Sequence, residues 1–116
     1  MCRALRVLCV AEGPERLAAL RRAAVSAAWE LAPGAASEEE GLALLDAERP
    51  HVLVAFGPFP RLVAEALARG IRVIADRELP GAEGLAVAGS LEEVRALVLG
   101  ARPGGPVRRG GGSGGA

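Results

Sequence analysis

The sequence predicts an α/β domain, a three-layer sandwich in which a mostly parallel sheet of four or five strands lies between two layers of helices. Continuous apolar runs at 4–11, 51–57 and 71–75 are too short for helices and rich in β-branched residues, as in strands buried on both faces. Segments in which apolar residues recur at helical spacing separate these runs. A chain of 116 residues suits one such domain, with right-handed crossovers between its strands.

The first strand is expected at 4–11 and the first helix at Pro14, where the missing N–H of proline costs nothing. Charged residues fall on one side of this helix, and its buried face is expected to contain Leu17, Leu20, Ala24, Val25 and Ala28. The alternating segment 29–32 predicts a short outer strand with one half-exposed face.

The second helix is expected to begin at a capping box. Ser37 and Glu40 have the spacing at which the hydroxyl accepts an N–H and the carboxylate reaches back. Apolar residues continue the helix at Leu42, Leu45 and Ala47 until Pro50 ends it. The run 51–57 follows, and its apolar character on both faces predicts the central strand of the sheet.

Two prolines, Pro58 and Pro60, are expected to begin the third helix, and Gly70 is expected to end it. The apolar face of this helix comprises Leu62, Val63, Ala66 and Leu67. The run 71–75 predicts a fourth strand.

The connection to the last strand, at 85–88, is shorter than a parallel crossover normally requires. Eight residues separate Asp76 from Leu85, whereas such crossovers usually need about a dozen or more. The sequence therefore predicts either a tight connection, a loop or one turn of helix, or an antiparallel strand at the edge of the sheet.

A second capping box, Ser90 with Glu93, predicts a last helix that runs to Gly100. The domain is expected to occupy residues 1–101. Glycine dominates the remaining residues, 102–116, which by composition form a flexible tail or an interdomain linker.

Charge and cysteine content exclude several classes of function. Fourteen basic residues balance fourteen acidic ones, so nothing directs the fold as a whole to nucleic acid or an anionic membrane. No apolar run approaches the roughly 20 residues that span a bilayer. Cys2 and Cys9 flank one strand about 20 Å apart, too far for a disulfide, which indicates a reducing, cytoplasmic setting. No cofactor and no metal site are expected.

Three segments, 6–15, 29–56 and 90–94, resemble corresponding parts of a response-regulator receiver domain in the order and spacing of their residues. The resemblance covers half to two-thirds of the chain and implies a flavodoxin-like fold and a role in bacterial signal transduction. The short connection before 85–88 departs from the family, in which a helix and a signalling surface occupy this place.

The resemblance also implies that the family's phosphorylation chemistry is missing. Phe56 stands at the end of the central strand, where a receiver has its phosphoacceptor aspartate. Ala11 and Glu12 follow the first strand, where a receiver has acidic residues that hold magnesium. Asp76 or Arg77 stands where the family has a hydroxyl residue after the fourth strand. Val87 stands where it has a lysine after the fifth. Phosphoryl transfer needs the carboxylate and a cation. The chain is thus expected to be a pseudo-receiver that is not an enzyme.

Such a domain is expected to act by binding a protein, either as a regulatory module or as the amino-terminal domain of a ParA/MinD-like ATPase. Gly57, Pro58 and Phe59 form a stiff apolar segment at the carboxyl edge of the sheet, where Phe59 either contacts a partner or packs inward. A homodimer through the last strand and helix is a further possibility.

Two alternatives assign a small-molecule role. The segment 64–76 resembles part of a Rossmann domain, which would bind a nucleotide, although 12–14 has one glycine where such sites use three. Cys9 would be the nucleophile if the chain resembled the sugar-phosphotransferase IIB proteins, but it lies inside a strand and is expected to be a buried apolar residue. His51 begins the central strand at the opposite edge and is expected to be solvated. Glu12 and Asp76 are the two carboxylates expected to converge at the carboxyl edge.

Overall fold

A five-stranded parallel sheet forms the centre of the computed structural model, which describes residues 5–78 and 85–100. The strand order is β2-β1-β3-β4-β5, and all four pairings are parallel. The strands are β1 (Leu5–Ala11), β2 (Trp29–Leu31), β3 (Val52–Phe56), β4 (Arg72–Ala75) and β5 (Ala86–Val87). This is the doubly wound, flavodoxin-like order, so the predicted fold class is confirmed.

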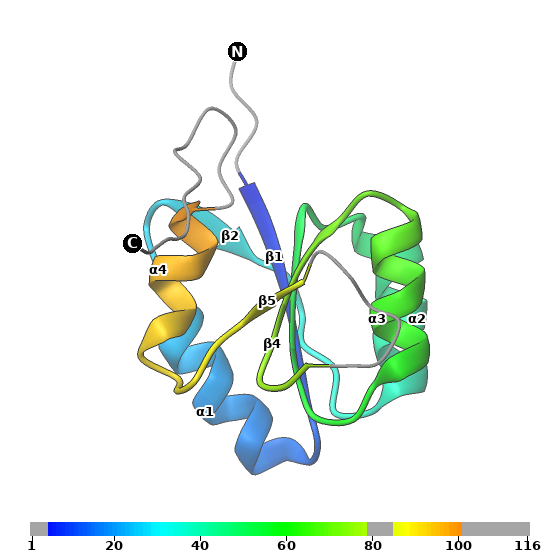
Figure 1. Cartoon of the computed structure of the whole chain (residues 1–116), viewed down its shortest axis with the longest axis horizontal. Coiled ribbons are helices and arrows are strands. Elements are labelled where there is room, and N and C mark those ends of the chain that lie inside the picture. The colour runs from blue at the N-terminus through cyan, green and yellow to red at the C-terminus, as the bar shows by residue number, and fades with distance from the viewer. Residues whose placement is uncertain (1–4, 79–84, 101–116) are drawn as a thin grey trace.

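Helices cover both faces of the sheet (Figure 1). They are α1 (Pro14–Ala24), α2 (Glu38–Glu48), α3 (Pro60–Ala68) and α4 (Glu93–Gly100). Side chains of α1 and α4 pack with one set of strand residues, and those of α2 and α3 pack with the alternate set. No helix in the described residues is long and apolar enough to cross a membrane.

The predicted capping box of α2 is present. The Ser37 hydroxyl accepts the N–H of Glu40 at 3.2 Å, and the Glu40 carboxylate accepts the N–H of Ala36 at 3.0 Å. The glutamate thus reaches one residue beyond the cap. At the other end, Arg49 adopts a left-handed conformation with φ 49°, and its N–H donates to the carbonyl of Leu45.

The first helix is shorter than its apolar spacing predicts. It ends at Ala24, whose carbonyl accepts the indole N–H of Trp29 at 2.7 Å. Val25 is already extended and 52% exposed, and Ala28 is exposed. The prediction that Val25 and Ala28 belong to the buried face is therefore wrong, because Trp29 fills the space beside the helix end instead.

The last strand is parallel, so the antiparallel alternative is wrong. Ile74 is opposite Ala86 and Ala75 is opposite Val87, and the N–H of Ala88 donates to the carbonyl of Ala75. Ten residues, 76–85, connect the two strands. The predicted loop or helical turn falls on residues 79–84, which lie outside the described part.

The last helix begins at Glu93, later than the capping box at Ser90 predicts. The Glu93 N–H donates to the backbone carbonyl of Ser90, while the Glu93 carboxylate accepts the N–H of Gly89 at 2.8 Å. The Glu93 carboxylate thus reaches back as in a capping box, but to the residue before Ser90. The proposed linker 102–116 lies outside the described residues.

The left-handed conformation of Arg49 makes a prediction about stability. This conformation crowds a Cβ atom, and glycine adopts it without that cost. Replacing Arg49 by glycine should therefore give a domain about 1 kcal/mol more stable than replacing it by alanine, since both lose the guanidinium and only glycine relieves the backbone. Urea unfolding of R49G and R49A measures the difference, and equal midpoints would contradict it.

Candidate functional site

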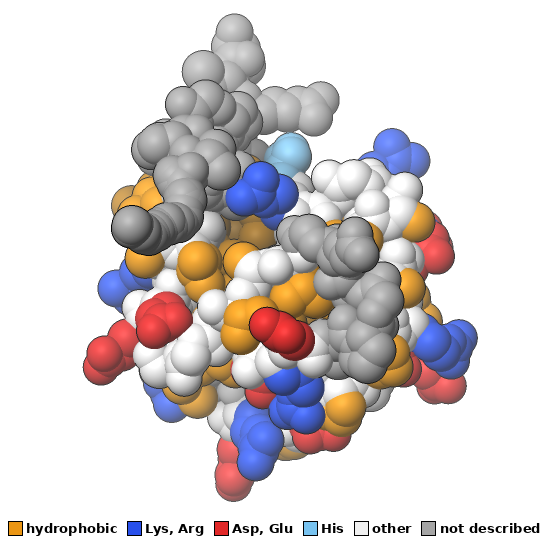
Figure 2. Space-filling model, viewed as in Figure 1, with side chains coloured by type: hydrophobic (Ala, Val, Ile, Leu, Met, Phe, Trp, Pro, Cys, Tyr) orange, Lys and Arg blue, Asp and Glu red, His pale blue; other side chains and the backbone are white. Residues whose placement is uncertain are grey.

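The positions compared with a receiver's phosphorylation site converge at the carboxyl edge of the sheet. Ala11 is opposite Phe56 in the pairing of β1 with β3, and Ala55 is opposite Ala75 in the pairing of β3 with β4. The strands therefore end side by side, at the lower end of the view in Figure 1. Figure 2 shows acidic and basic side chains gathered at this edge.

The centre of this edge is apolar. Ala11 is fully buried, and Phe56 is partly buried with its side chain packed against the core on the α1 and α4 side. Neither side chain carries an oxygen or nitrogen atom that can accept a phosphoryl group or bind a metal ion. The structure thus places an aromatic ring where the resemblance puts an acceptor carboxylate.

Asp76 binds the backbone that follows Phe56. One oxygen of its carboxylate accepts the N–H of Gly57 at 3.2 Å. The Arg77 guanidinium donates to both carboxylate oxygens, each at 3.0 Å. The hydrogen bond from Arg77 lowers the pKa of Asp76, and the bond from Gly57 adds to this effect, while partial burial opposes it. Asp76 is therefore an ionised group that joins the ends of β3 and β4.

Glu12 lies over the same turn. A Cβ atom added to Gly57 would lie 3.2 Å from Cγ of Glu12, and the φ of Gly57 is +143°, which glycine adopts far more readily than other residues. The hydrogen bonds with Asp76 raise the pKa of Arg77, and the charge of Glu12 acts in the same direction. The two carboxylates thus converge as expected, and Arg77 is the counter-ion of Asp76, a pairing that the sequence reasoning missed.

The segment after β3 mostly faces inward. Phe59 is 4% exposed, and its ring lies over Gly57, at 2.8 Å from the position that a Cβ atom would take. Gly57 is buried as well, whereas Pro58 is exposed. Of the two roles expected for Phe59, inward packing is the one the structure shows. Val87 ends β5 and is 41% exposed.

A third carboxylate at this edge caps a neighbouring helix. Glu38, in the first turn of α2, accepts the N–H groups of Arg61 at 2.8 Å and Leu62 at 3.0 Å. These donors belong to the first turn of α3, where a bound anion is otherwise favourable. Sequence spacing gives no signal for this contact, because it joins residues 23 positions apart. Here too a side chain of the protein occupies backbone donors that a phosphate group would use.

Cys9 is unsuited to nucleophilic chemistry. It is fully buried within β1, and burial raises the pKa of its thiol to about 12 despite the opposing charge of Arg21. The thiolate is the reactive form, and it is essentially absent at neutral pH. The structure therefore contradicts the alternative in which Cys9 carries a phosphoryl group.

His51 lies at the opposite, amino edge, and its role is structural. The ring Nδ1 of His51 accepts the backbone N–H of Arg6 at 2.9 Å, and the backbone N–H of His51 donates to the carbonyl of Arg6. It thus continues the pairing of β3 with β1 beyond the end of the strand. In the described residues, no group of three histidine, cysteine, aspartate or glutamate side chains is arranged to hold a metal ion.

Comparison with known proteins supports the fold. No protein-family model matches the sequence, and no curated protein matches it. Among solved structures, the response regulator domain of Thermotoga maritima CheB superposes with a TM-score of 0.60, over 84% of this chain and 92% of that one. The chain therefore has a receiver-like fold. Sequence identity is 15%, so the likeness of this receiver-like domain to CheB concerns the fold alone.

The ionised state of Asp76 predicts a pH-dependent contribution to stability. Because its folded-state pKa is lowered from 3.8, the contribution is present above that value and is lost as the pH falls through the folded-state pKa. We expect D76N to be about 1 kcal/mol less stable than the wild type at pH 7, a modest value for a hydrogen-bonded charge pair with an exposed arginine.

Urea unfolding at about pH 7 and about pH 2 measures this difference, which should shrink at the lower pH. The matched control is E78Q, since Glu78 is exposed and accepts no hydrogen bond within the described residues. The interpretation is wrong if D76N and the wild type differ equally at both pH values.

Proposed function

We propose that this receiver-like domain has no phosphorylation switch and acts by binding a protein, as a regulatory or interaction module. The observation that carries the proposal is Phe56, which stands at the end of β3 beside Ala11, where phosphotransfer to a carboxylate would require the carboxylate itself. A receiver-like fold without the acceptor carboxylate keeps the surfaces that bind other proteins but cannot be regulated by phosphorylation at this position.

The surroundings of Phe56 support the same proposal. Incoming phosphate is stabilised by cations and by N–H donors directed at its oxygens. At this edge, the Asp76 carboxylate accepts the backbone N–H of Gly57. The Glu38 carboxylate accepts the backbone N–H groups of Arg61 and Leu62, so these donors are already hydrogen-bonded. Phosphate would meet three carboxylates, and two of these already accept the backbone N–H groups nearby.

A candidate surface for a protein partner lies around β5 and α4. The large apolar side chains that are exposed in the described residues are Val25, Val87, Leu91 and Leu99. Three of these four belong to β5, to α4 or to the turn that begins α4. Exposed apolar side chains favour protein contact, and a homodimer is one form that such a contact would take.

A narrower proposal concerns the larger protein. The glycine-rich composition of 102–116 is typical of an interdomain linker, so we propose that the domain precedes a ParA/MinD-like ATPase. Reading the gene beyond the codon for Ala116 tests this proposal. A stop codon at that point, with no ATPase or kinase encoded nearby, would exclude it.

The absence of a switch predicts the result of adding an acceptor. We expect F56D, incubated with acetyl phosphate and magnesium, to gain no phosphoryl group in intact-mass spectrometry. The new carboxylate would have Ala11 and Val87 where a receiver-type site has an acid and a lysine, and a single substitution restores neither.

A receiver domain with the complete set of site residues, treated in parallel, shows that the reagent is active. Phosphorylation of F56D would mean that the edge is still a working site and would refute the proposal. In a thermal-shift assay of the wild type, nucleotides, acetyl phosphate and magnesium should leave the melting temperature unchanged, and stabilisation by a few degrees would favour the nucleotide-binding alternative.

The surface around β5 and α4 predicts the effect of a charge on self-association. If two copies pair there, sedimentation equilibrium of the wild type should give about twice the mass of the chain at high concentration. L99E should then be monomeric, because it places a charge in the apolar contact.

The matched control is A64E, which adds the same charge at an exposed position on α3. It should associate like the wild type. A monomeric wild type, or equal weakening by L99E and A64E, would refute pairing through this surface.

A further inference from the structure

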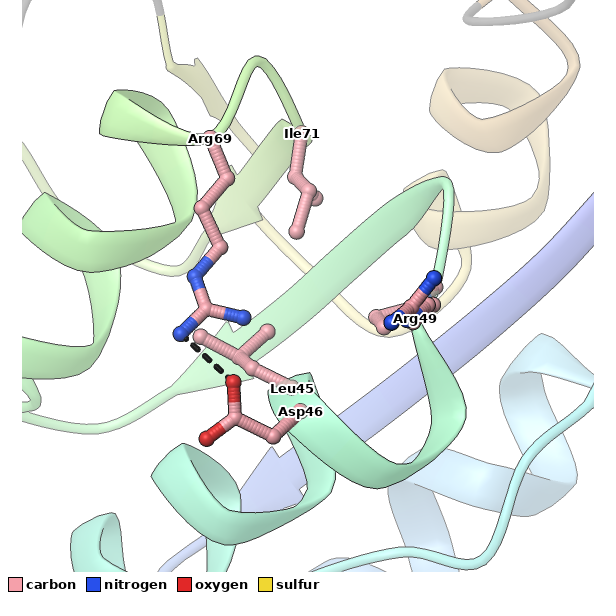
Figure 3. A pocket seen from close by; sticks show the side chains of 6 residues that line it. Leu45, Asp46, Arg49, Arg69 and Ile71 are labelled. Carbon is pink, nitrogen blue, oxygen red and sulfur yellow. Dashed lines mark ion pairs between the residues drawn. The ribbon is translucent and has the colours of Figure 1, made fainter.

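A hollow of about 460 Å³ opens at the amino edge of the sheet, away from Phe56. It lies where α2 and α3 end and β4 begins, and it is lined by Leu45, Asp46, Arg49, Pro50, Arg69 and Ile71. Figure 3 shows Arg69 and Arg49 on either side of Leu45, with Ile71 near Arg69. The volume is in the range of small-ligand sites.

The floor of the hollow is apolar. Leu45 is fully buried, Pro50 is buried, and Ile71 packs against the core while remaining partly accessible. These side chains offer no hydrogen bonds. They suit a short aliphatic group, which would gain free energy by leaving water.

The two arginines differ in their bonding. The Arg69 guanidinium forms ion pairs with Asp46 at 2.8 Å and with Glu65 at 2.9 Å, which raise the pKa of Arg69. Within residues 5–78 and 85–100, Arg49 forms no ion pair. The N–H groups of the Arg49 guanidinium are therefore available to a ligand beside the apolar floor.

Arg49 also has an unfavourable backbone for its type. It is the one residue other than glycine with a positive φ in the described part of the chain. Glycine or asparagine usually fills the left-handed position that ends a helix. An arginine kept in a strained conformation beside a hollow points to a use for its side chain.

Helix carboxyl ends carry partial negative charge, which would oppose an anion here. At the end of α3 this charge is reduced, because the N–H groups of Arg69, Gly70 and Ile71 donate to carbonyls of its last turn. At the end of α2 the N–H of Arg49 likewise donates to Leu45. The Asp46 carboxylate, the acid that lines the hollow, is paired with Arg69. An anion beside Arg49 thus meets limited repulsion.

We propose that this hollow binds a carboxylate joined to a short, branched aliphatic group. The Arg49 guanidinium donates to both carboxylate oxygens, a geometry that its planar fork favours. The aliphatic group packs against Ile71, the apolar side chain of the hollow that is partly accessible. Such chemistry occurs in a free small acid and in the last residue of a peptide chain that ends in leucine. The site is independent of the proposed loss of phosphorylation at the other edge.

Titration of the isotope-labelled full chain with isovalerate, followed by NMR, tests the proposal. We expect saturable shifts of the Ile71 methyl signals as the acid is raised to about 50 mM, well beyond millimolar dissociation constants. Isovaleramide has the same shape without the charge, so it should bind at least about tenfold more weakly. Shifts that do not saturate, or equal binding of acid and amide, would overturn the proposal.

The decisive variant is R49G, which removes the guanidinium and also relieves the backbone, so a weakened fold cannot explain lost binding. We expect its dissociation constant for isovalerate to rise at least about tenfold. The matched control is R16Q, which removes an exposed arginine of α1 and should bind as the wild type does. Unchanged affinity in R49G would refute the site.

A tetrapeptide that ends in leucine separates the two sources of the ligand. Tighter binding of the peptide with a free carboxyl end, lost when that end is amidated, supports the carboxyl terminus of a protein. Binding of isovalerate alone supports a small organic acid. Both results place the carboxylate at Arg49. If neither the peptide nor isovalerate binds, the site is excluded.

Discussion

The burial of β3 on both faces is the constraint on which the rest of the structure depends. Val52 to Ala55 are fully buried, and so are the paired residues of β1 from Val7 to Ala11. Each such aliphatic side chain contributes about 1.5–3 kcal/mol when removed from water, which requires a helical layer on either side. No polar or charged residue in the described part of the chain is buried. Recognition and chemistry are therefore confined to the two edges of the sheet and the outer surfaces of the helices.

At the carboxyl edge, the free backbone donors are used to hold the fold together. The ends of parallel strands and the starts of helices present N–H groups, which in many α/β proteins bind an anionic ligand. Here Asp76 links the end of β3 to β4, and Glu38 links the start of α3 to α2. The same hydrogen bonds that stabilise this edge engage donors that an anion would otherwise use, in line with the proposed loss of phosphorylation. An apolar Phe56 is compatible with that arrangement, whereas an acceptor aspartate would add a further negative charge beside Glu12, Asp76 and Glu38.

Local patterns predicted the fold well, and contacts between distant residues account for what they missed. Short continuous apolar runs favour buried strands over other structures. The capping box at Ser37 depends on two residues only three positions apart. The end of α1 depends on the indole of Trp29, so the apolar spacing that continues through Val25 misleads. The bond from Glu38 to Leu62 crosses between two helices and has no spacing rule. Nothing in the sequence around Arg49 predicts its left-handed backbone conformation.

The two edges of the sheet thus differ in how their charges are balanced. At the carboxyl edge, Arg77 is paired with Asp76, which also accepts the backbone N–H of Gly57. At the amino edge, Arg69 is paired twice, but Arg49 is held by its backbone in a position where its charge gains no described ion pair. The left-handed backbone of Arg49 costs free energy that no ion pair of its guanidinium offsets within the described residues. By this argument the edge opposite a receiver's phosphorylation site is the better place to look for a ligand.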